Sequence, residues 1–146
     1  MSVTLVPSSA RTTTGTSGAL DKAITGRGRA TAAIFWLSIT ADESTGSDVL
    51  EVFLQHSLDG GSTWQDFAAF DPAAGNAGNA GLVQQLQWVR NTNDTEAQGA
   101  QMGAQSAGTV DNGPIGPDIR VYWAITDASG SASFTFEVSG RFELDR

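Results

Sequence analysis

Residues 57–64 form the strongest local pattern in the chain and read Ser-Leu-Asp-Gly-Gly-Ser-Thr-Trp. In a tight turn, an aspartate side chain can accept hydrogen bonds from backbone N–H groups, and a glycine permits a positive φ. A tryptophan at the end of such a segment can pack beneath the loop. The spacing therefore predicts a structural turn rather than a catalytic site. Its defining residues are Ser57, Asp59, Gly61 and Trp64.

His56 is the only histidine and immediately precedes this turn. It continues the alternation of Leu50, Val52 and Leu54, so we expect it to face the sheet interior or its rim. Any Ser-His-Asp enzyme would have to use this imidazole, and no partner for it stands out. The absence of cysteine excludes a disulfide framework and a cysteine-rich zinc site. We therefore expect no catalytic residues, no bound metal and no cofactor.

The carboxylates are dispersed along the chain. A glycoside hydrolase needs two carboxylates that converge across a cleft, and the sequence singles out no such pair. No Asp-x-Asp-x-Asp run suits calcium, and no Gly-x-x-x-x-Gly-Lys loop suits a phosphate. The sequence thus argues against an enzyme.

Charge is distributed unevenly over the 146 residues, whose net charge is −8. Residues 1–30 hold four basic residues and one acidic residue, whereas residues 31–146 hold four basic and fifteen acidic residues. An acidic body repels phosphate backbones, so we expect no nucleic-acid partner. The basic N-terminal side chains are candidates for contacts with an acidic protein surface, and they are Arg11, Lys22, Arg27 and Arg29.

Most aromatic residues occupy strand positions that suit a core. Trp36 and Tyr122 lie off the main apolar alternation of their strands, so we expect both to be exposed. Exposed aromatic side chains serve subunit interfaces, and they can also stack on sugar rings. Trp36 and Tyr122 are therefore candidate contacts with another protein or a second subunit.

Apolar residues alternate with period two along most of the chain, which indicates strands rather than helices. The alternation is clearest at residues 119–126 and 133–142, which flank a turn-forming segment at 127–130 and predict an antiparallel hairpin. Residues 29–40 are apolar on both faces, which predicts a central strand. Further strands are expected at 49–56, 63–70 and 82–89, with short ones at 3–6 and 19–25.

Seven or eight strands in one small domain predict an all-β fold. The expected form is an antiparallel two-sheet sandwich of jelly-roll or immunoglobulin-like architecture. We expect an extended N-terminal arm or edge strand at residues 1–28 and the sandwich at 29–146. Two Gly- and Asn-rich stretches, 71–81 and 91–117, are expected to be loops. The longer one offers little apolar surface to offset its ordering entropy, so we expect either that a neighbouring chain orders it or that it is a floppy surface loop.

No segment resembles a membrane span or a secretory signal. The longest apolar stretch, residues 32–39, is far shorter than the ~20 residues that cross a bilayer. The N-terminus lacks a basic residue before an apolar run. We therefore expect no membrane partner and assembly in a cytoplasm.

Residues 57–64 resemble the Asp-box of sialidases and other propeller proteins, where the motif is structural and recurs once per blade. Here it occurs once, and 146 residues are too few for a propeller. The resemblance therefore supports a structural turn.

The order of segments resembles small structural proteins of tailed bacteriophages. The segments that carry this resemblance are 3–12, 30–40, 52–64, 119–123 and 133–140. The likeness covers most of the chain except residues 71–117. It implies a capsid decoration (cement) protein that binds the outer head surface, bridges capsomers and stabilises the shell. The implied partner is the major capsid protein, the implied form is a homotrimer, and the implied location is the capsid surface after assembly in the host cytoplasm.

Two alternatives stay open: a tail or baseplate structural protein of the same fold class, and a carbohydrate-binding β-sandwich module. Under the decoration hypothesis, the arm at residues 1–30 lies on the capsid or on a neighbouring subunit, where its basic residues meet acidic surface. The same hypothesis has residues 91–117 ordered at an intersubunit contact.

Overall fold

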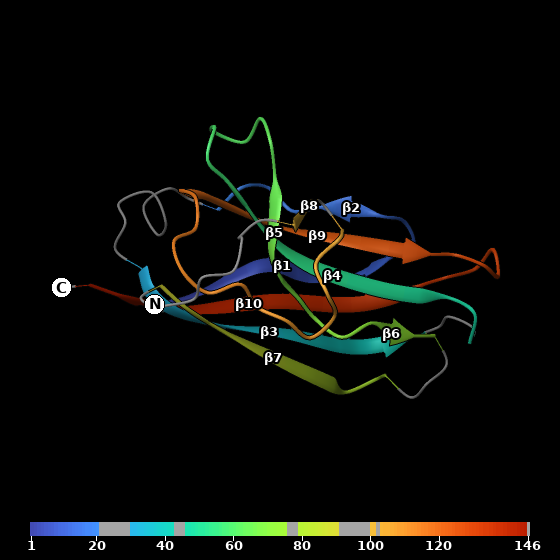
Figure 1. The fold of residues 1–146 in the computed structure, drawn as a ribbon. Helices are drawn as coiled ribbons and strands as arrows, with labels where there is room; N and C mark the ends of the chain where they lie inside the picture. The colour runs from blue at the N-terminus through green and yellow to red at the C-terminus, as the bar shows by residue number, and fades with distance from the viewer. Residues whose placement is uncertain (21–29, 43–45, 76–78, 91–99, 102, 146) are drawn as a thin grey trace.

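The computed structural model describes residues 1–20, 30–42, 46–75, 79–90, 100–101 and 103–145. Within these ranges the chain forms strands, turns and bends, and the strands make two antiparallel sheets packed against each other (Figure 1). This described part has no helix that could cross a membrane. The predicted all-β, two-sheet sandwich is therefore confirmed.

The first sheet, sheet A, has the strand order β1-β10-β3-β7. Its strands are β1 (Ser2–Arg11), β10 (Phe134–Leu144), β3 (Ala30–Asp42) and β7 (Leu82–Val89). β3 is flanked by β10 and β7, so the prediction of a central strand at residues 29–40 is confirmed. β1 and β7 are the two edges of this sheet.

The second sheet, sheet B, has the order β2-β9-β4-β5-β8, and β6 pairs with β4 beside this path. Its strands are β2 (Gly15–Thr16), β9 (Asp118–Thr126), β4 (Val49–Ser57), β5 (Gln65–Ala69), β6 (Ala73–Ala74) and β8 (Ala100–Gln101). Residues 119–126 and 133–142 form the predicted strands, but they belong to different sheets. The hairpin prediction is therefore wrong, because the turn at 127–130 carries the chain across the sandwich.

The core lies between the two sheets. The ring of Phe35 meets the edges of Phe67 from sheet B and Phe142 from sheet A, with ring centroids 6.0 and 5.6 Å apart. Gly140 makes room for this cluster, because a Cβ at that position would lie 3.2 Å from the Phe35 ring. β10 alternates inward apolar with outward polar residues in the packed structure, whereas β3 carries apolar side chains on both faces.

The N-terminal residues run along the edges of both sheets. β1 pairs with β10, and β2 pairs with β9. Beyond β2, the backbone N–H of Leu20 donates to the carbonyl of Ile119. β1 is longer than the predicted strand at 3–6, since an edge position tolerates Pro7. The expected strand at 19–25 falls mostly outside the described residues.

The second half of the 91–117 stretch is ordered by its own chain. The N–H of Asp111 donates to the Phe67 carbonyl at 2.7 Å, and the N–H of Ala69 donates to the Thr109 carbonyl at 3.0 Å. Val110 and Ile115 pack against the core. The expectation that a neighbouring chain orders this stretch is therefore corrected for residues 103–117, whereas residues 91–99 lie outside the described part.

Candidate functional site: contact surfaces

The Asp59 turn projects from sheet B between β4 and β5 (Figure 1). Its Oδ1 accepts hydrogen bonds from the N–H of Thr63 and the hydroxyl of Ser57, and its Oδ2 accepts one from the Thr63 hydroxyl. The Ser57 hydroxyl oxygen also accepts from the N–H of Gly61, and the Trp64 indole donates to the Gly61 carbonyl. Gly60 and Gly61 have φ values of 72° and 92°. The predicted structural turn is confirmed.

The hydrogen bonds of this turn stabilise the charged form of Asp59. They lower the pKa of its carboxyl to about 2, with the backbone bond from Thr63 as the largest cause. Leu58 takes no part in this bonding, and its side chain is 73% exposed. The carboxylate therefore serves the turn.

A network of polar side-chain contacts connects this turn to the 103–117 segment. The guanidinium of Arg120 lies 4.2 Å from the Trp64 ring centroid, and its Nε donates to the side-chain oxygen of Gln55. Gln55 donates to Asp66 Oδ1, and Asp66 Oδ2 accepts from the N–H groups of Ala104 and Gln105. Gln55 and Asp66 are fully buried, so this network of contacts has a structural role.

His56 is buried at the end of β4, as its alternation predicted. Its Nδ1 accepts a hydrogen bond of 2.8 Å from the N–H of Gly116, and its Nε2 has no partner among the described residues. The neutral tautomer with its proton on Nε2 follows from this arrangement. Burial lowers the pKa of His56, although Asp111 opposes the shift. Among the described residues, no hydroxyl or carboxylate is hydrogen-bonded to the ring.

Arg11 is engaged within its own chain. Its guanidinium donates to the carbonyls of Pro7, Ser9 and Phe136. It also lies 5.0 Å from the Trp123 ring centroid and 4.6 Å from that of Phe136. Arg11 thus joins β1, β9 and β10 at one margin of the sandwich. Its contact with a capsid stays a prediction, and Lys22, Arg27 and Arg29 lie outside the described residues.

The two candidate aromatic contacts lie on different sheets. Tyr122 of β9 stacks on Phe53, with centroids 5.7 Å apart, and a Cβ at Gly103 would lie 3.3 Å from its ring. The 103–117 segment therefore covers this side of sheet B. Trp36 of β3 lies on sheet A, where its register neighbours are Ser139 and Gln85. Both Trp36 and Tyr122 are half-buried, so the expectation that they are exposed is corrected.

The outer face of sheet A is apolar at its centre. Ala32, Ile34 and Trp36 lie along the central strand β3 and are half-buried. The flanking outward side chains are Val83, Gln85 and Gln87 on β7, and Glu137, Ser139, Arg141 and Glu143 on β10. We call these residues together the A-face. Unlike sheet B, this face has no described loop packed over it.

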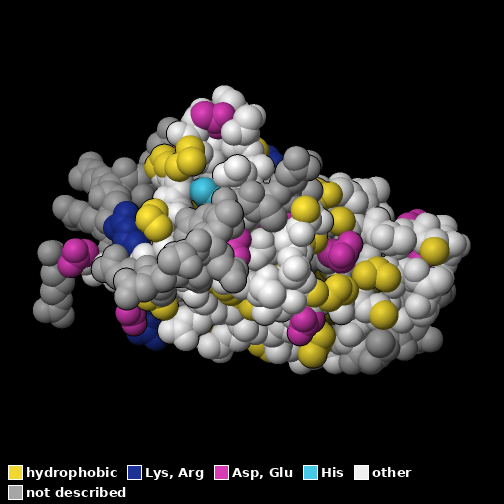
Figure 2. All heavy atoms as spheres, viewed as in Figure 1, with side chains coloured by type: hydrophobic (Ala, Val, Ile, Leu, Met, Phe, Trp, Pro, Cys, Tyr) yellow, Lys and Arg dark blue, Asp and Glu magenta, His cyan; other side chains and the backbone are white. Residues whose placement is uncertain are grey.

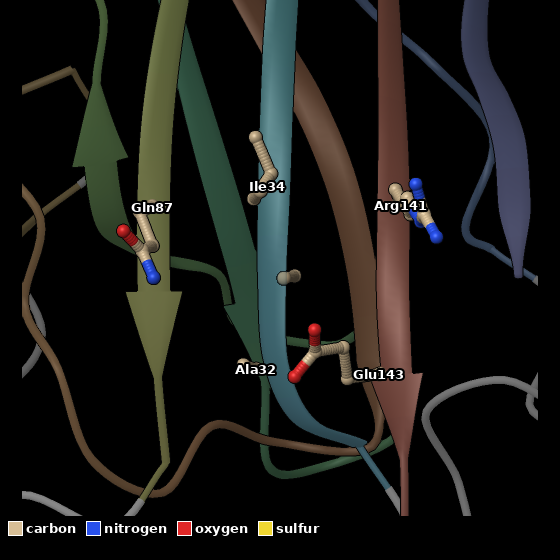
Figure 3. A pocket seen from close by; sticks show the side chains of 6 residues that line it. Ala32, Ile34, Gln87, Arg141 and Glu143 are labelled. Atoms are coloured by element: carbon tan, nitrogen blue, oxygen red, sulfur yellow. The ribbon is translucent and has the colours of Figure 1, made fainter.

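A shallow cavity of about 230 Å³ lies on the A-face and is lined by Ala32, Ala33, Ile34, Gln87, Arg141 and Glu143. Figure 3 shows the Glu143 carboxylate directed toward β3, with the Arg141 guanidinium pointing away from it. The cavity holds a single carboxylate and no imidazole or thiol. Hydrolytic chemistry with two acids is therefore not provided by this lining.

The described part of the chain contains no group of three or more His, Cys, Asp or Glu side chains that could hold a metal ion. In Figure 2, the acidic side chains are scattered over the visible face, and the hydrophobic ones form small separate areas. Two polar residues that sequence reasoning did not single out, Gln55 and Asp66, support the 103–117 segment, and the indole N–H of buried Trp88 donates to the Gly113 carbonyl of that segment. In the sequence, the feature that could have identified Gln55 and Asp66 is a polar residue within a predicted strand.

Comparison with models of known protein families, with curated proteins and with solved structures finds no match to this chain.

Proposed function

We propose that this chain is a bacteriophage capsid decoration protein that binds the outer surface of the head. The observation that carries the proposal is the A-face, a sheet surface with Ala32, Ile34 and Trp36 at its centre and no described loop over it. An apolar centre with a polar rim is typical of protein contact surfaces. The phage setting and the major capsid protein as partner rest on the sequence resemblance.

The proposed mechanism is mechanical. Packaged DNA presses on a thin shell, which tends to separate where capsomers meet. A bound protein that spans this boundary adds contact area that must be lost before the shell opens. When several contacts belong to one bound molecule, formation of the first raises the effective concentration for the next, so each contact need not be strong by itself.

Co-sedimentation with purified capsids of the phage that carries this gene tests the proposal. We expect the wild-type chain to bind saturably and to raise the temperature at which capsids release DNA. Ile34→Lys places a charge at the centre of the A-face and should abolish binding. Leu58→Lys is the matched control, because Leu58 is exposed on the Asp59 turn. Failure of the wild type to bind, or unchanged binding of I34K, would refute the proposal.

A carbohydrate-binding module is the second candidate, because Trp36 lies between the polar neighbours Ser139 and Gln85. The rings of Trp64 and Trp123 are covered by arginine side chains, and Trp88 is buried. Trp36 is thus the described tryptophan that best suits stacking on a sugar. A glycan array would support this function if binding were specific and lost in Trp36→Ala. Electron cryomicroscopy of the virion would distinguish head decoration from a tail or baseplate role.

A further inference from the structure

The edge strand β7 differs from every other edge in the described part of the molecule. It pairs with β3 over eight consecutive residue pairs without a register shift. β1, the opposite edge of sheet A, contains Pro7 and two register shifts. The edges of sheet B, β2 and β8, have two residues each. Proteins normally protect a long regular edge with charge, proline or bulges, and β7 has none of these.

The direction of the backbone groups along β7 follows from its C-terminal end. The N–H of Val89 donates to the Asn112 side chain, and its carbonyl accepts from Gly113, so both point away from β3. The N–H of Arg90 donates to Thr31 at the start of β3 and so points toward it. Because these directions alternate along a strand, the backbone groups of Val83, Gln85 and Gln87 also point away from β3.

These three residues have exposed side chains, and Val83 is 60% exposed. No described residue pairs with their outward backbone groups. The three positions therefore present a row of donors and acceptors that another strand can complete.

We propose that β7 pairs antiparallel with β7 of a second copy of this chain, joining two copies of sheet A into one continuous sheet. A two-fold axis beside Gln85 sets Gln85 opposite its own counterpart and Val83 opposite Gln87 of the other copy. Such an interface must be self-complementary. β7 meets this requirement because it carries no charge, so no like charges face each other across the axis.

A second copy fits this edge better than a head-to-tail contact does. Head-to-tail pairing would need a different edge of matching length, and β1 is interrupted while β2 and β8 are short. The edge geometry thus favours a two-fold dimer in place of the homotrimer that the sequence resemblance implies. The net charge of −8 on each copy opposes association, so rising salt should strengthen the dimer.

Sedimentation equilibrium of the full chain and of Gln85→Pro tests the contact. Proline removes an N–H that points away from β3, so the β3–β7 ladder keeps its hydrogen bonds. We expect a wild-type dimer and a monomeric Q85P variant with unchanged far-UV circular dichroism. A monomeric wild type, or a dimer or trimer that persists in Q85P, would overturn the proposal.

If Q85P fails to fold, variants with a charge at position 85 test the same contact. Gln85→Lys and Gln85→Glu each set like charges opposite one another and should raise the dimer dissociation constant about fivefold or more. An equimolar mixture of Q85K and Q85E should recover the wild-type constant as a heterodimer. Ser139→Lys, on the A-face but on β10, is the control and should leave the constant unchanged. No recovery in the mixture would overturn the self-pairing.

These measurements use the isolated chain, so their outcome is independent of capsid binding. A monomer that still binds capsids through Ile34 would refute the β7 contact and leave the proposed function standing. A dimer that does not bind capsids would refute the proposed function and leave the β7 contact standing.

Discussion

Asp59 holds its turn through both carboxylate oxygens, which accept bonds from Ser57 and Thr63. We expect Asp59→Ala to lower the melting temperature and to speed amide hydrogen exchange at Gly61 and Thr63, because the turn loses its central acceptor. Leu58→Ala serves as control, since its exposed side chain takes no part in these bonds. Equal exchange rates in D59A and wild type would show that the turn is held by other contacts.

The low pKa of Asp59 gives the same turn an acid dependence. The folded value of about 2 lies below the ordinary value of 3.8. Stabilisation by this group is therefore complete above pH 3.8 and is lost as pH falls toward 2.

His56 should make the fold less stable below neutral pH. Burial lowers its folded pKa beneath the ordinary value of 6.5, so the unfolded chain takes up the proton first. This contribution is complete above pH 6.5 and is lost as pH falls through that value toward the folded pKa. His56→Asn keeps an acceptor for the Gly116 N–H but does not titrate, so its urea midpoint should vary less between neutral pH and pH 5. The same slope in both proteins would contradict this role.

At the scale of single residues, sequence reasoning succeeded where all partners lie close together in the chain. The Asp59 turn closes within eight residues, and the Asp59 carboxylate accepts the predicted kind of bond, from the backbone N–H of Thr63. The partner of His56 is Gly116, sixty positions away, and no local pattern connects them.

At the scale of elements, Asp66 on β5 anchors the 103–117 segment. Asp66→Asn replaces a carboxylate oxygen with an amide that cannot satisfy both Gln55 and the two backbone donors at 104 and 105. We expect a loss of about 1–3 kcal/mol in the free energy of unfolding, because buried donors lose their acceptor. Chemical denaturation measures the loss. Asp145→Asn removes the same charge at an exposed position and should have no effect; an equal effect of both substitutions would contradict the anchoring role.

The long strands were predictable because each one carries its own pattern of apolar residues. The two-residue strands β2, β6 and β8 and the packing of the 103–117 segment were not predicted. That segment has little apolar surface, and its anchors are spread over β4, β5 and β7. The 119–126 and 133–142 strands show a related limit. Each was predicted correctly, yet a turn sequence does not reveal whether it joins neighbours in one sheet or crosses to the other.

At the scale of the whole molecule, the N-terminal segment is part of the sandwich. Deletion of residues 2–11 removes β1 and leaves β10 as an unpaired edge. We expect at least about 3 kcal/mol of lost stability from Leu5 and Val6 alone, together with aggregation. Urea denaturation and light scattering measure both effects. Deletion of residues 145–146 is the control, and a stable, soluble protein without β1 would show that the segment is a dispensable arm.

The sequence alone determined the all-β class, the central position of β3, the Asp59 turn and the inward side of His56. Each depends on residue type and spacing within one segment, where period two or a short turn sets the geometry. Only the tertiary structure decided which strands share a sheet, that Arg11 bonds within its own chain, that residues 103–117 pack on sheet B, and that β7 is left as an open edge. These features depend on contacts between segments far apart in the chain, and the alternation within a strand does not specify which strand lies beside it.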